Sequence, residues 1–302
     1  MKKNQMNSRR RKEALIGYSY MSPSFLILLL FIIIPIVISV VLSFMKYNGF
    51  SGAEWIGTAN YEKLFHDKTF GTSLVNTFVY VLISVPGQVI LSLVFAAILA
   101  EKFRDGYGEF IRGTLFIPVL CSTSLVGYLF YYLFASDKEA FVNMVLTMLG
   151  MEPHAWLAQR STALLIICLV TIWKNVGYYL VIIYAAIMDV PVSLYEAAMV
   201  DGASPMDKFL HITLPSIKPI LYTVITLCTI WSFQVFDLTY VMTKGGPGNA
   251  TISPVLYLYD QAFSGHKLGY ASAVACVLAL VIFVLTIALR AVFGEKAGDE
   301  DA

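Results

Sequence analysis

The chain has 302 residues, of which 58% are hydrophobic and only 14% charged, and its mean hydropathy is +0.72. Soluble domains carry about 25% charged residues, so this composition indicates a membrane protein rather than a soluble domain. The net charge of +1 argues against nucleic acid as a partner, because binding to phosphates needs a clustered surplus of basic residues.

A helix of about 20 apolar residues is long enough to cross the hydrocarbon core of a bilayer. Six segments meet this condition and predict an all-α protein with six spans, built as a single transmembrane domain over residues 1–302. The spans are expected at residues 22–45, 74–100, 112–135, 162–187, 219–243 and 271–293. Pro35, Pro86 and Pro118 lie inside three spans, where a proline predicts a kink rather than an end.

The distribution of Lys and Arg predicts the orientation of these spans. With the N-terminus inside, the cytoplasmic segments hold 13 basic residues, six of them before the first span, and the outer loops hold 7. We therefore expect both termini and the loop at residues 188–218 in the cytoplasm. The first apolar run exceeds that of a signal peptide and no A-x-A site follows it, which predicts an uncleaved span.

Residues that could bind metal or form disulfides do not form a recognisable pattern. The cysteines lie within apolar runs, which predicts buried packing residues: Cys121, Cys168, Cys228 and Cys276. The histidines are scattered in loops without metal-ligand spacing: His66, His154, His211 and His266. The acidic tail at 299–301 is interpreted as a solvated end, so neither a metal site nor an enzyme active site is predicted.

The segment between the fourth and fifth spans is polar and suited to form short helices. Ser193 can cap a helix in which Leu194, Ala197 and Ala198 share one face, with Glu196 off that face. Such a helix could lie on the bilayer or dock on another protein, and the residues alone leave both interpretations open.

A turn and a second helical piece are expected to follow. Asp201-Gly202 predicts the turn, and Ser204-Pro205 the start of the second piece. Three apolar residues, Phe209, Ile212 and Leu214, would anchor this piece at the bilayer interface. Two prolines, Pro215 and Pro219, would bend the chain into the fifth span.

The run E-A-A-x-x-D-G-A, followed by F-x-x-I-T-L-P and K-P, resembles the cytoplasmic EAA loop of binding-protein-dependent ABC importer permeases. The matching residues are Glu196, Ala197, Ala198, Asp201, Gly202, Ala203, Phe209, Ile212, Leu214 and Pro215. The resemblance implies a coupling helix that sits in a groove of an ATP-hydrolysing subunit. It further implies that Glu196 pairs with a basic residue there and that Gly202 allows the turn.

Further matches, among them Phe236-Asp237, Tyr240-Val241 and T-K-G-G-P at 243–247, are similar to the carbohydrate-uptake branch of that family, near its maltose-permease-like subunit. This resemblance implies a second permease, two subunits that bind ATP and Mg, and an extracytoplasmic sugar-binding protein in a bacterial cell membrane. The chain itself would hold no cofactor and catalyse no reaction. The chain departs from the pattern in its short first outer loop and at Ala140, where glycine is frequent.

Two charged residues fall inside predicted spans, where charge is costly and usually faces a cavity or a partner. Lys174 and Asp237 differ in depth by roughly six residues, or about 9 Å at the rise of an α-helix. An ion pair between helices, the lining of a polar cavity and contact with the partner permease remain open for them.

Four further residues carry groups that bind sugars, namely aromatic faces and amides: Asn175, Tyr178, Trp231 and Gln234. Tyr178 and the Trp231–Gln234 turn fall close to where related permeases contact sugar, as the resemblance implies, and ordinary helix packing is the alternative. Gln234 has the stronger case because an amide in hydrocarbon needs a partner. Outside the fifth span, Gly245, Gly246 and Pro247 form either a rigid turn or a contact with the binding protein.

These patterns favour the permease subunit of an ATP-driven importer of a sugar or oligosaccharide. A phosphorylated polyol such as glycerol 3-phosphate is the second candidate cargo, with Lys174 as its one basic residue inside a span. A transporter or channel that works without an ATPase often has broken helices in repeated halves, and the sequence shows no such repeat.

Overall fold

The computed structural model describes residues 16–103 and 106–293. The basic segment before residue 16 and the acidic tail at 299–301 lie outside the described residues, so the orientation inferred from them stays a prediction. The described chain is mostly helical, as predicted, and its two described strands are short. These strands, β1 (Met45–Lys46) and β2 (Glu54–Trp55), pair in antiparallel register.

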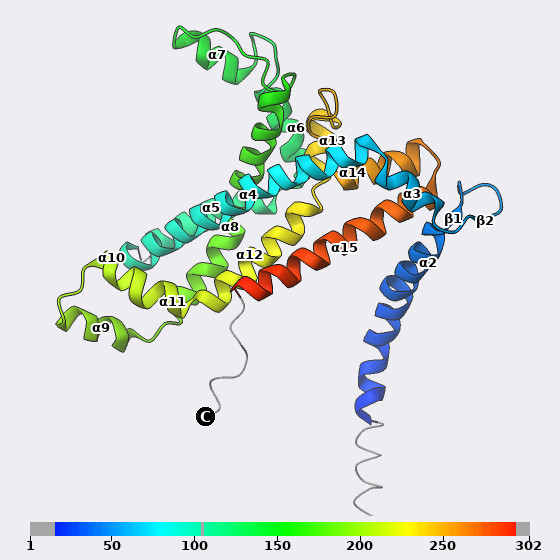
Figure 1. The fold of residues 1–302 in the computed structure, drawn as a ribbon. Coiled ribbons are helices and arrows are strands. Elements are labelled where there is room, and N and C mark those ends of the chain that lie inside the picture. The colour runs from blue at the N-terminus through cyan, green and yellow to red at the C-terminus, as the bar shows by residue number, and fades with distance from the viewer. Residues whose placement is uncertain (1–15, 104–105, 294–302) are drawn as a thin grey trace, which may run out of the picture. The chain divides into compact units, whose positions relative to one another are not determined.

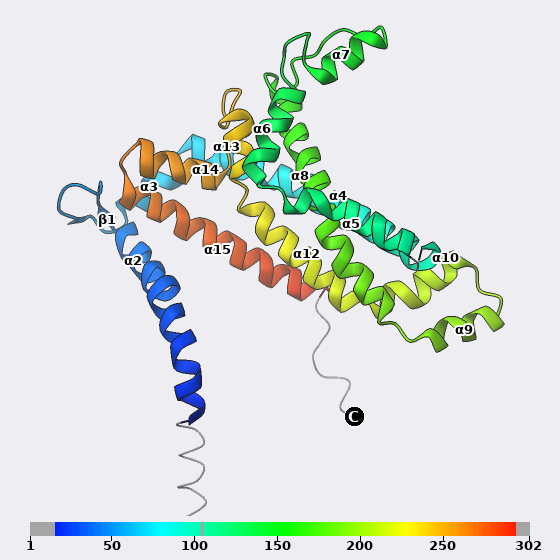
Figure 2. The same cartoon turned by 180° about the vertical axis from the view of Figure 1, so that it is seen from behind.

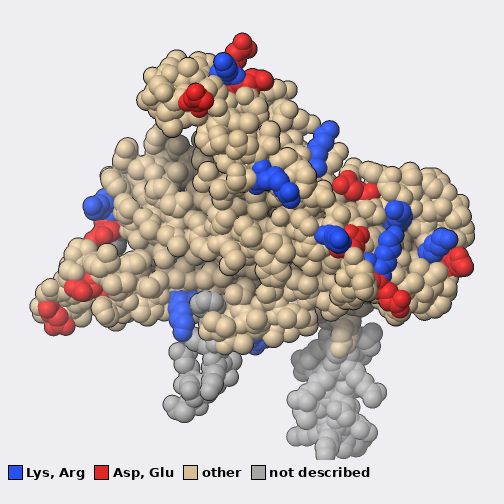
Figure 3. Space-filling view, turned by 45° about the horizontal axis from the view of Figure 1, so that its top comes forward, with Lys and Arg blue, Asp and Glu red and all other residues tan. Residues whose placement is uncertain are grey.

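Four described helices are long and apolar enough to cross a membrane: Ile16–Ser43, Lys68–Lys102, Arg160–Met188 and Leu268–Val292. The number rises to as many as six if each of two bent helix pairs forms one span. The six predicted spans therefore correspond to four continuous helices and two broken ones. Charged side chains are sparse over the body of the face drawn in Figure 3 and gather toward its edges, as expected for a surface in lipid.

The third predicted span, residues 112–135, is broken rather than merely kinked. It consists of α5 (Gly106–Leu120) and α6 (Thr123–Leu133), which meet at 92°. The break follows Pro118 by three residues, and Ser122 between the helices has an extended ψ of 133°. By contrast, α4 (Lys68–Lys102) continues through Pro86. A proline inside a span weakens the helix locally, because it removes a backbone hydrogen bond, but its position does not determine whether or where the helix is interrupted.

The prediction of one continuous helix for the fifth span, residues 219–243, was wrong. It divides into α12 (Lys218–Phe233) and α13 (Asp237–Thr243), and residues 234–236 between them are not helical. The bend of 70° lies earlier, between the segment Pro205–Ser216 and α12. Polar Gln234 and Asp237 flank the interruption, and the backbone groups that it frees lie beside a cavity described below.

The structure divides into two compact units. The first comprises the described part of Met1–His66 together with Asp260–Val277. It holds η1 (Leu29–Ile33), α2 (Ile34–Ser43), α3 (Ala59–Phe65), η3 (Asp260–Ser264) and the start of α15 (Leu268–Phe293). The amide of Asn60 donates to the carbonyls of Ser43 and Met45 at 2.8 and 3.0 Å, which fixes α2 against α3.

The second unit, Asp67–Tyr259 with the described part of Leu278–Ala302, is organised around α8 (Arg160–Met188). Helices α4, α5 and α12 pack against α8, as Figures 1 and 2 show from opposite sides. Gly177 lets α5 approach closely, because a Cβ there would stand 2.1 Å from the carbonyl oxygen of Leu115. Close approach through small residues is how helices associate in membranes.

Two apolar clusters form the core of this second unit. One runs along α4, α8 and α12 and includes Tyr179, Ile183, Ile187, Ile217 and Cys228. The other surrounds Tyr80, Ile167 and Leu238. Of the cysteines, Cys168 and Cys228 are buried as predicted, whereas Cys121 and Cys276 are half-buried, so the expectation of four buried cysteines was wrong for two.

Candidate functional site

A cavity of about 320 Å³ lies beside the interruption that follows α12. Side chains of α4, α6, α8, α12 and α13 converge on it, together with the three interrupting residues. The lining residues are Tyr80, Gln88, Thr123, Thr171, Lys174, Asn175, Tyr179, Trp231, Ser232, Gln234, Val235, Phe236, Asp237 and Leu238. The lining thus combines aromatic rings, amides, hydroxyls and two charges, which is the kind of mixed lining found in small-molecule sites.

Lys174 and Asp237 both line this cavity. Lys174 is only 8% exposed, while Asp237 at the start of α13 is exposed. No ion pair joins them in the part of the chain that the structure describes. Of the roles left open by the sequence, lining of a polar cavity is therefore the one that this structure displays.

A hydrogen-bonded pair of amides joins α4 to α8 at the cavity wall. The amide of Asn175 donates to Gln88 Oε1 at 3.1 Å, and Gln88 Nε2 donates to the carbonyl of Ser84 at 2.9 Å. Gln88 is buried, with 1% of its surface exposed. The pair fixes the orientation of the Asn175 side chain, which is necessary for an amide that is to discriminate between hydroxyl groups.

Aromatic side chains form another part of the wall. Trp231 is 48% exposed, and its ring lies 5.4 Å from that of Tyr178 and 6.4 Å from that of Tyr179. Tyr179 lines the cavity, whereas Tyr178 contacts the Trp231 ring but is not one of the lining residues.

The segment between α8 and α12 contains the predicted short helix, α9 (Val192–Val200). Pro191 rather than Ser193 takes the N-cap position, so the expected cap at Ser193 was wrong. The helix ends in a Schellman motif: Gly202, with φ of +77°, donates to Met199 O, and Ala203 donates to Ala198 O at 2.9 Å. The predicted turn at Asp201-Gly202 is present.

No residue of α9 is buried. Glu196 and Ala197 are exposed and Ala198 is half-buried. Among the larger apolar side chains, Leu194 is 47% exposed and Val200 is 88% exposed. In both views of the fold α9 lies beyond the end of α8, next to the segment of α10 and α11 (Figures 1 and 2).

The second helical piece begins at Ser204-Pro205, as predicted. In α10 (Pro205–Lys208), Ser204 and Asp207 form a reciprocal capping box with bonds of 3.2 and 3.1 Å. It continues through the π-helical turn η2 (Phe209–Thr213) into α11 (Leu214–Ser216). The residues expected to anchor this piece, Phe209, Ile212 and Leu214, are half-buried, and Pro215 is exposed.

The outer turn after α13 is more enclosed than its glycines suggest. Gly245 is buried, and Gly246 and Pro247 are half-buried. Asn76 on α4 donates to the carbonyls of Asn249 and Ile252 at 2.8 and 3.1 Å, which pins the turn to the spans. The exposed tip consists of Lys244, Gly248 and Asn249.

The loop after this turn connects it to the cavity. Ser253 donates to the carbonyl of Val235, a cavity-lining residue, at 2.7 Å. Farther along, α14 (Pro254–Tyr259) packs on α4. The loop that follows the outer turn is therefore hydrogen-bonded to the cavity wall.

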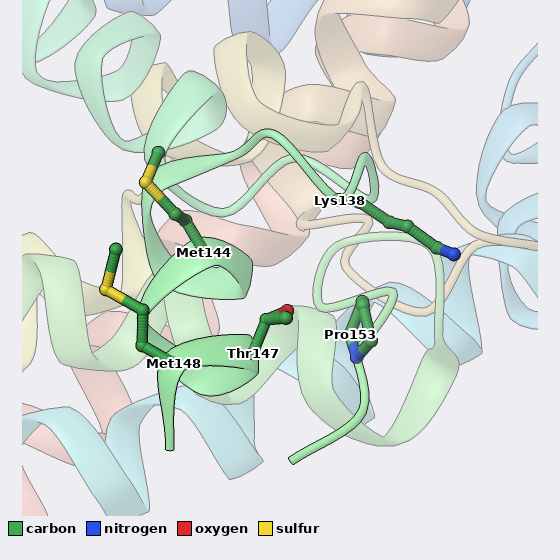
Figure 4. Close-up of a pocket in the computed structure, with 5 residues that line it drawn as sticks. All are labelled: Lys138, Met144, Thr147, Met148 and Pro153. Carbon is green, nitrogen blue, oxygen red and sulfur yellow. The ribbon is translucent and has the colours of Figure 1, made fainter. Parts of the chain in front are cut away.

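A separate hollow of about 420 Å³ lies beside the outer helix α7 (Phe141–Met148). Figure 4 shows Met144 and Met148 on one side of it, with Lys138 and Pro153 on the other. The fully buried Asn143 holds the helix in place, since its amide bonds to both flanking loops at 3.0–3.2 Å. Ala140, where the sequence departs from the expected glycine, takes the N-cap position in an extended conformation, φ −61° and ψ 139°.

Residues 56–293 match the protein family described as "Binding-protein-dependent transport system inner membrane component". The chain belongs to this family. It is 35% identical over 290 residues to the probable ABC transporter permease protein YurN of Bacillus subtilis, covering 95% of this chain and 98% of the relative. It is 34% identical to the arabinooligosaccharides transport system permease protein AraP of the same organism, covering 93% and 90% of the two chains.

A similar fold is found in a solved structure, the "bacterial ABC transporter involved in the import of the acidic polysaccharide alginate". The TM-score is 0.83 at 23% identity, and the match covers 97% of this chain and 99% of that chain. The likeness in fold thus extends over nearly the whole of both chains.

Five of the six predicted substrate-path residues of this permease line the cavity: Lys174, Asn175, Trp231, Gln234 and Asp237. Sequence reasoning missed Tyr80, Gln88, Thr171 and Tyr179. Gln88 could have been found, because the argument that an amide in a span needs a partner applies to it as it does to Gln234. Tyr80 and Thr171, which bond to each other at 2.8 Å, carry no such signal.

Proposed function

We propose that the chain is a permease subunit of an ATP-driven importer that translocates a sugar or oligosaccharide delivered by an extracytoplasmic binding protein. The observation that carries this proposal is α9: a helix with the sequence of the EAA loop that has no buried residue and leaves Leu194, Met199 and Val200 exposed. An exposed apolar helix of this kind favours a protein partner, because apolar surface in water is unfavourable.

The partner of α9 is proposed to be an ATP-hydrolysing subunit. Leu194, which is 47% exposed, shares one face of α9 with the exposed Ala197, and these two residues would enter its groove, while Glu196 would pair with a basic residue at the rim. Gly202 sets the angle at which the helix is presented. Two such subunits would bind ATP and Mg, and this chain would contribute no catalytic residue.

The cavity supports a carbohydrate cargo. Trp231 offers an aromatic face, and Asn175 and Gln234 offer amides to hydroxyl groups. The name of the relative AraP refers to arabinooligosaccharides, which agrees with a sugar. Glycerol 3-phosphate is less well supported, because Lys174 is the one basic residue lining the cavity and Asp237 lines it as well.

Transport would follow alternating access, driven by the partner subunits in a bacterial cell membrane. ATP binding would close the ATPase subunits and move α9, and the cavity between this chain and a second permease would open toward the binding protein. The exposed tip at Lys244, Gly248 and Asn249 would contact that protein, with Gly245, Gly246 and Pro247 as its rigid base. Hydrolysis would then return the cavity to the inside, with lipid around the spans.

Co-purification tests this function. The chain is tagged at its C-terminus, extracted from its native membrane in mild detergent and analysed by mass spectrometry. We expect an ATPase subunit and a second multi-span permease to be recovered with it. Glu196→Lys reverses the charge and Gly202→Asp strains the turn, so each variant should lose the ATPase or uncouple it while still inserting in the membrane.

The result also separates the competing classes. A wild-type chain that is recovered alone, indistinguishable from Glu196→Lys, would favour a transporter or channel that needs no ATPase. Normal uptake by both variants would contradict the assignment of α9 as the coupling helix.

A further inference from the structure

One hydrogen bond joins α9 to the chain that leads into α12. The hydroxyl of Tyr195, on α9, lies 2.9 Å from Thr213 Oγ1, in η2. Thr213 is 5% exposed, and its hydroxyl also lies 3.4 Å from the carbonyl of Lys208. Either hydroxyl can donate the shared bond.

Tyr195 also connects α9 to the core of the spans. Its ring packs against the apolar cluster that contains Ile183, Ile187 and Ile217. Within α9, all of whose residues are described, it is the one side chain that packs there. The same cluster includes Tyr179, which lines the central cavity. A continuous apolar path thus leads from the cavity wall along α8 to Tyr195.

Both ends of α9 are connected to the neighbouring helices by non-helical residues about which the helix could rotate. Pro191 precedes the helix, and Gly202, in the left-handed conformation, follows it. Without a further contact, α9 could rotate about these residues while the spans stayed in place. The hydrogen bond between Tyr195 and Thr213 restricts this rotation, so that α9 would move together with η2 and the start of α12.

We propose that Tyr195 and Thr213 form a clamp that transmits movement between the coupling helix and the spans. Both are positioning residues: neither faces the surface of α9 proposed to meet the ATPase, and neither lines the cavity. The clamp rests on the proposed function, because it needs an ATPase subunit bound to α9. Its loss should leave docking intact and weaken the signal that passes through the permease.

The experiment measures how strongly the binding protein, added on the outer side of the membrane, stimulates ATP hydrolysis on the inner side. The complete complex is reconstituted in vesicles, and MgATP hydrolysis is measured with and without the binding protein, which is purified with the ligand that it carries. The variants are Tyr195→Phe, which keeps the ring, and Thr213→Val, which keeps the shape. Tyr222→Phe and Thr223→Val on α12 are the matched controls, since the Thr223 hydroxyl bonds only to its own helix at Pro219.

A net hydrogen bond is worth a factor of about five in an equilibrium constant. We expect stimulation by the binding protein to fall about fivefold in Tyr195→Phe and in Thr213→Val, with unchanged basal hydrolysis and unchanged retention of the ATPase. The double variant should be no worse than either single variant. Thr213→Ser, which retains the hydroxyl, should keep the stimulation of the wild type.

Three results would overturn the clamp. They are wild-type stimulation in both single variants, additive losses in the double variant, and loss of the ATPase from Tyr195→Phe, which would make the tyrosine a docking residue. A wild-type complex that retains no ATPase would instead refute the proposed function, and the clamp would fall with it.

Discussion

The contact between α5 and α8 provides a sharp test of the packing. An alanine Cβ at Gly177 would stand 2.1 Å from the carbonyl oxygen of Leu115, where real Cβ contacts are almost never shorter than 3.0 Å. The two helices would have to separate by about 0.9 Å. Because the atom that is met belongs to the backbone, no side-chain rotation can relieve the clash.

The expected cost follows from two opposing effects. Overpacking in a core costs about 1–3 kcal/mol, and a contact with rigid backbone belongs at the upper end of that range. Alanine regains about 1 kcal/mol over glycine inside a helix. The net loss for Gly177→Ala is therefore about 2 kcal/mol, which lowers the unfolding temperature by about 4–8 °C in a protein of this size class.

The matched control is Gly113→Ala, also within a helix of the same pair. A Cβ at Gly113 meets nothing within 4 Å, so this variant should be neutral or slightly more stable. Both variants would be compared by thermal unfolding of the purified complex, followed by uptake. Because Gly177 lies one turn from Lys174, we expect uptake to fall with stability. Equal unfolding temperatures for the two variants would refute the close approach of α5 and α8.

Three further substitutions test other parts of the account. Gln88→Leu leaves the Asn175 amide without its acceptor, so the KM for uptake should rise about tenfold while basal ATP hydrolysis stays unchanged. The control is Ser92→Ala, which removes a hydrogen bond between α4 and α8 outside the cavity and should leave the KM unchanged. Asn143→Leu removes the five bonds that hold α7, and limited proteolysis should then cut residues 135–159 faster; equal cleavage rates would contradict the role of this amide. Gly202→Val is strained by about 1–2 kcal/mol at a φ of +77° and should lower ATP hydrolysis driven by the binding protein without affecting insertion; normal hydrolysis would count against the turn.

Much of the fold could be predicted because lipid imposes a simple rule on the sequence. Apolar length alone located the helices around residues 68–102, 160–188 and 268–293, with ends displaced by a few residues. The rule does not report breaks. Residues 121–122 and 234–236 interrupt the helices inside runs that are still long and apolar enough to be predicted as spans. Such breaks are tolerated in a membrane where the freed backbone groups are satisfied within the protein or face a cavity.

The site was predictable to the extent that its residues are out of place in lipid. Lys174, Asp237 and Gln234 were predicted because charged and amide groups are costly in hydrocarbon and therefore usually face a cavity or a partner. Tyr179 and Tyr80 were missed because tyrosines are frequent in this chain and nothing in the sequence tells a lining tyrosine from its neighbour Tyr178.

The loop between α8 and α12 was predicted more completely, since Gly202 and Ser204-Pro205 act locally and need no tertiary context. The cap at Ser193 failed because Pro191, two residues earlier, already starts the helix. The hydrogen bond between Tyr195 and Thr213 joins residues 18 positions apart, and no local sequence pattern predicts it.

The most direct test of the central claim is uptake of radiolabelled sugar into vesicles that contain the reconstituted complex. The sugar is first identified by screening the co-purified binding protein. We expect uptake only when MgATP is inside and the loaded binding protein is outside, and none with Glu196→Lys in place of the wild-type chain. Uptake that proceeds without ATP, or that is unaffected by Glu196→Lys, would contradict the account of this chain as an ATP-driven importer subunit.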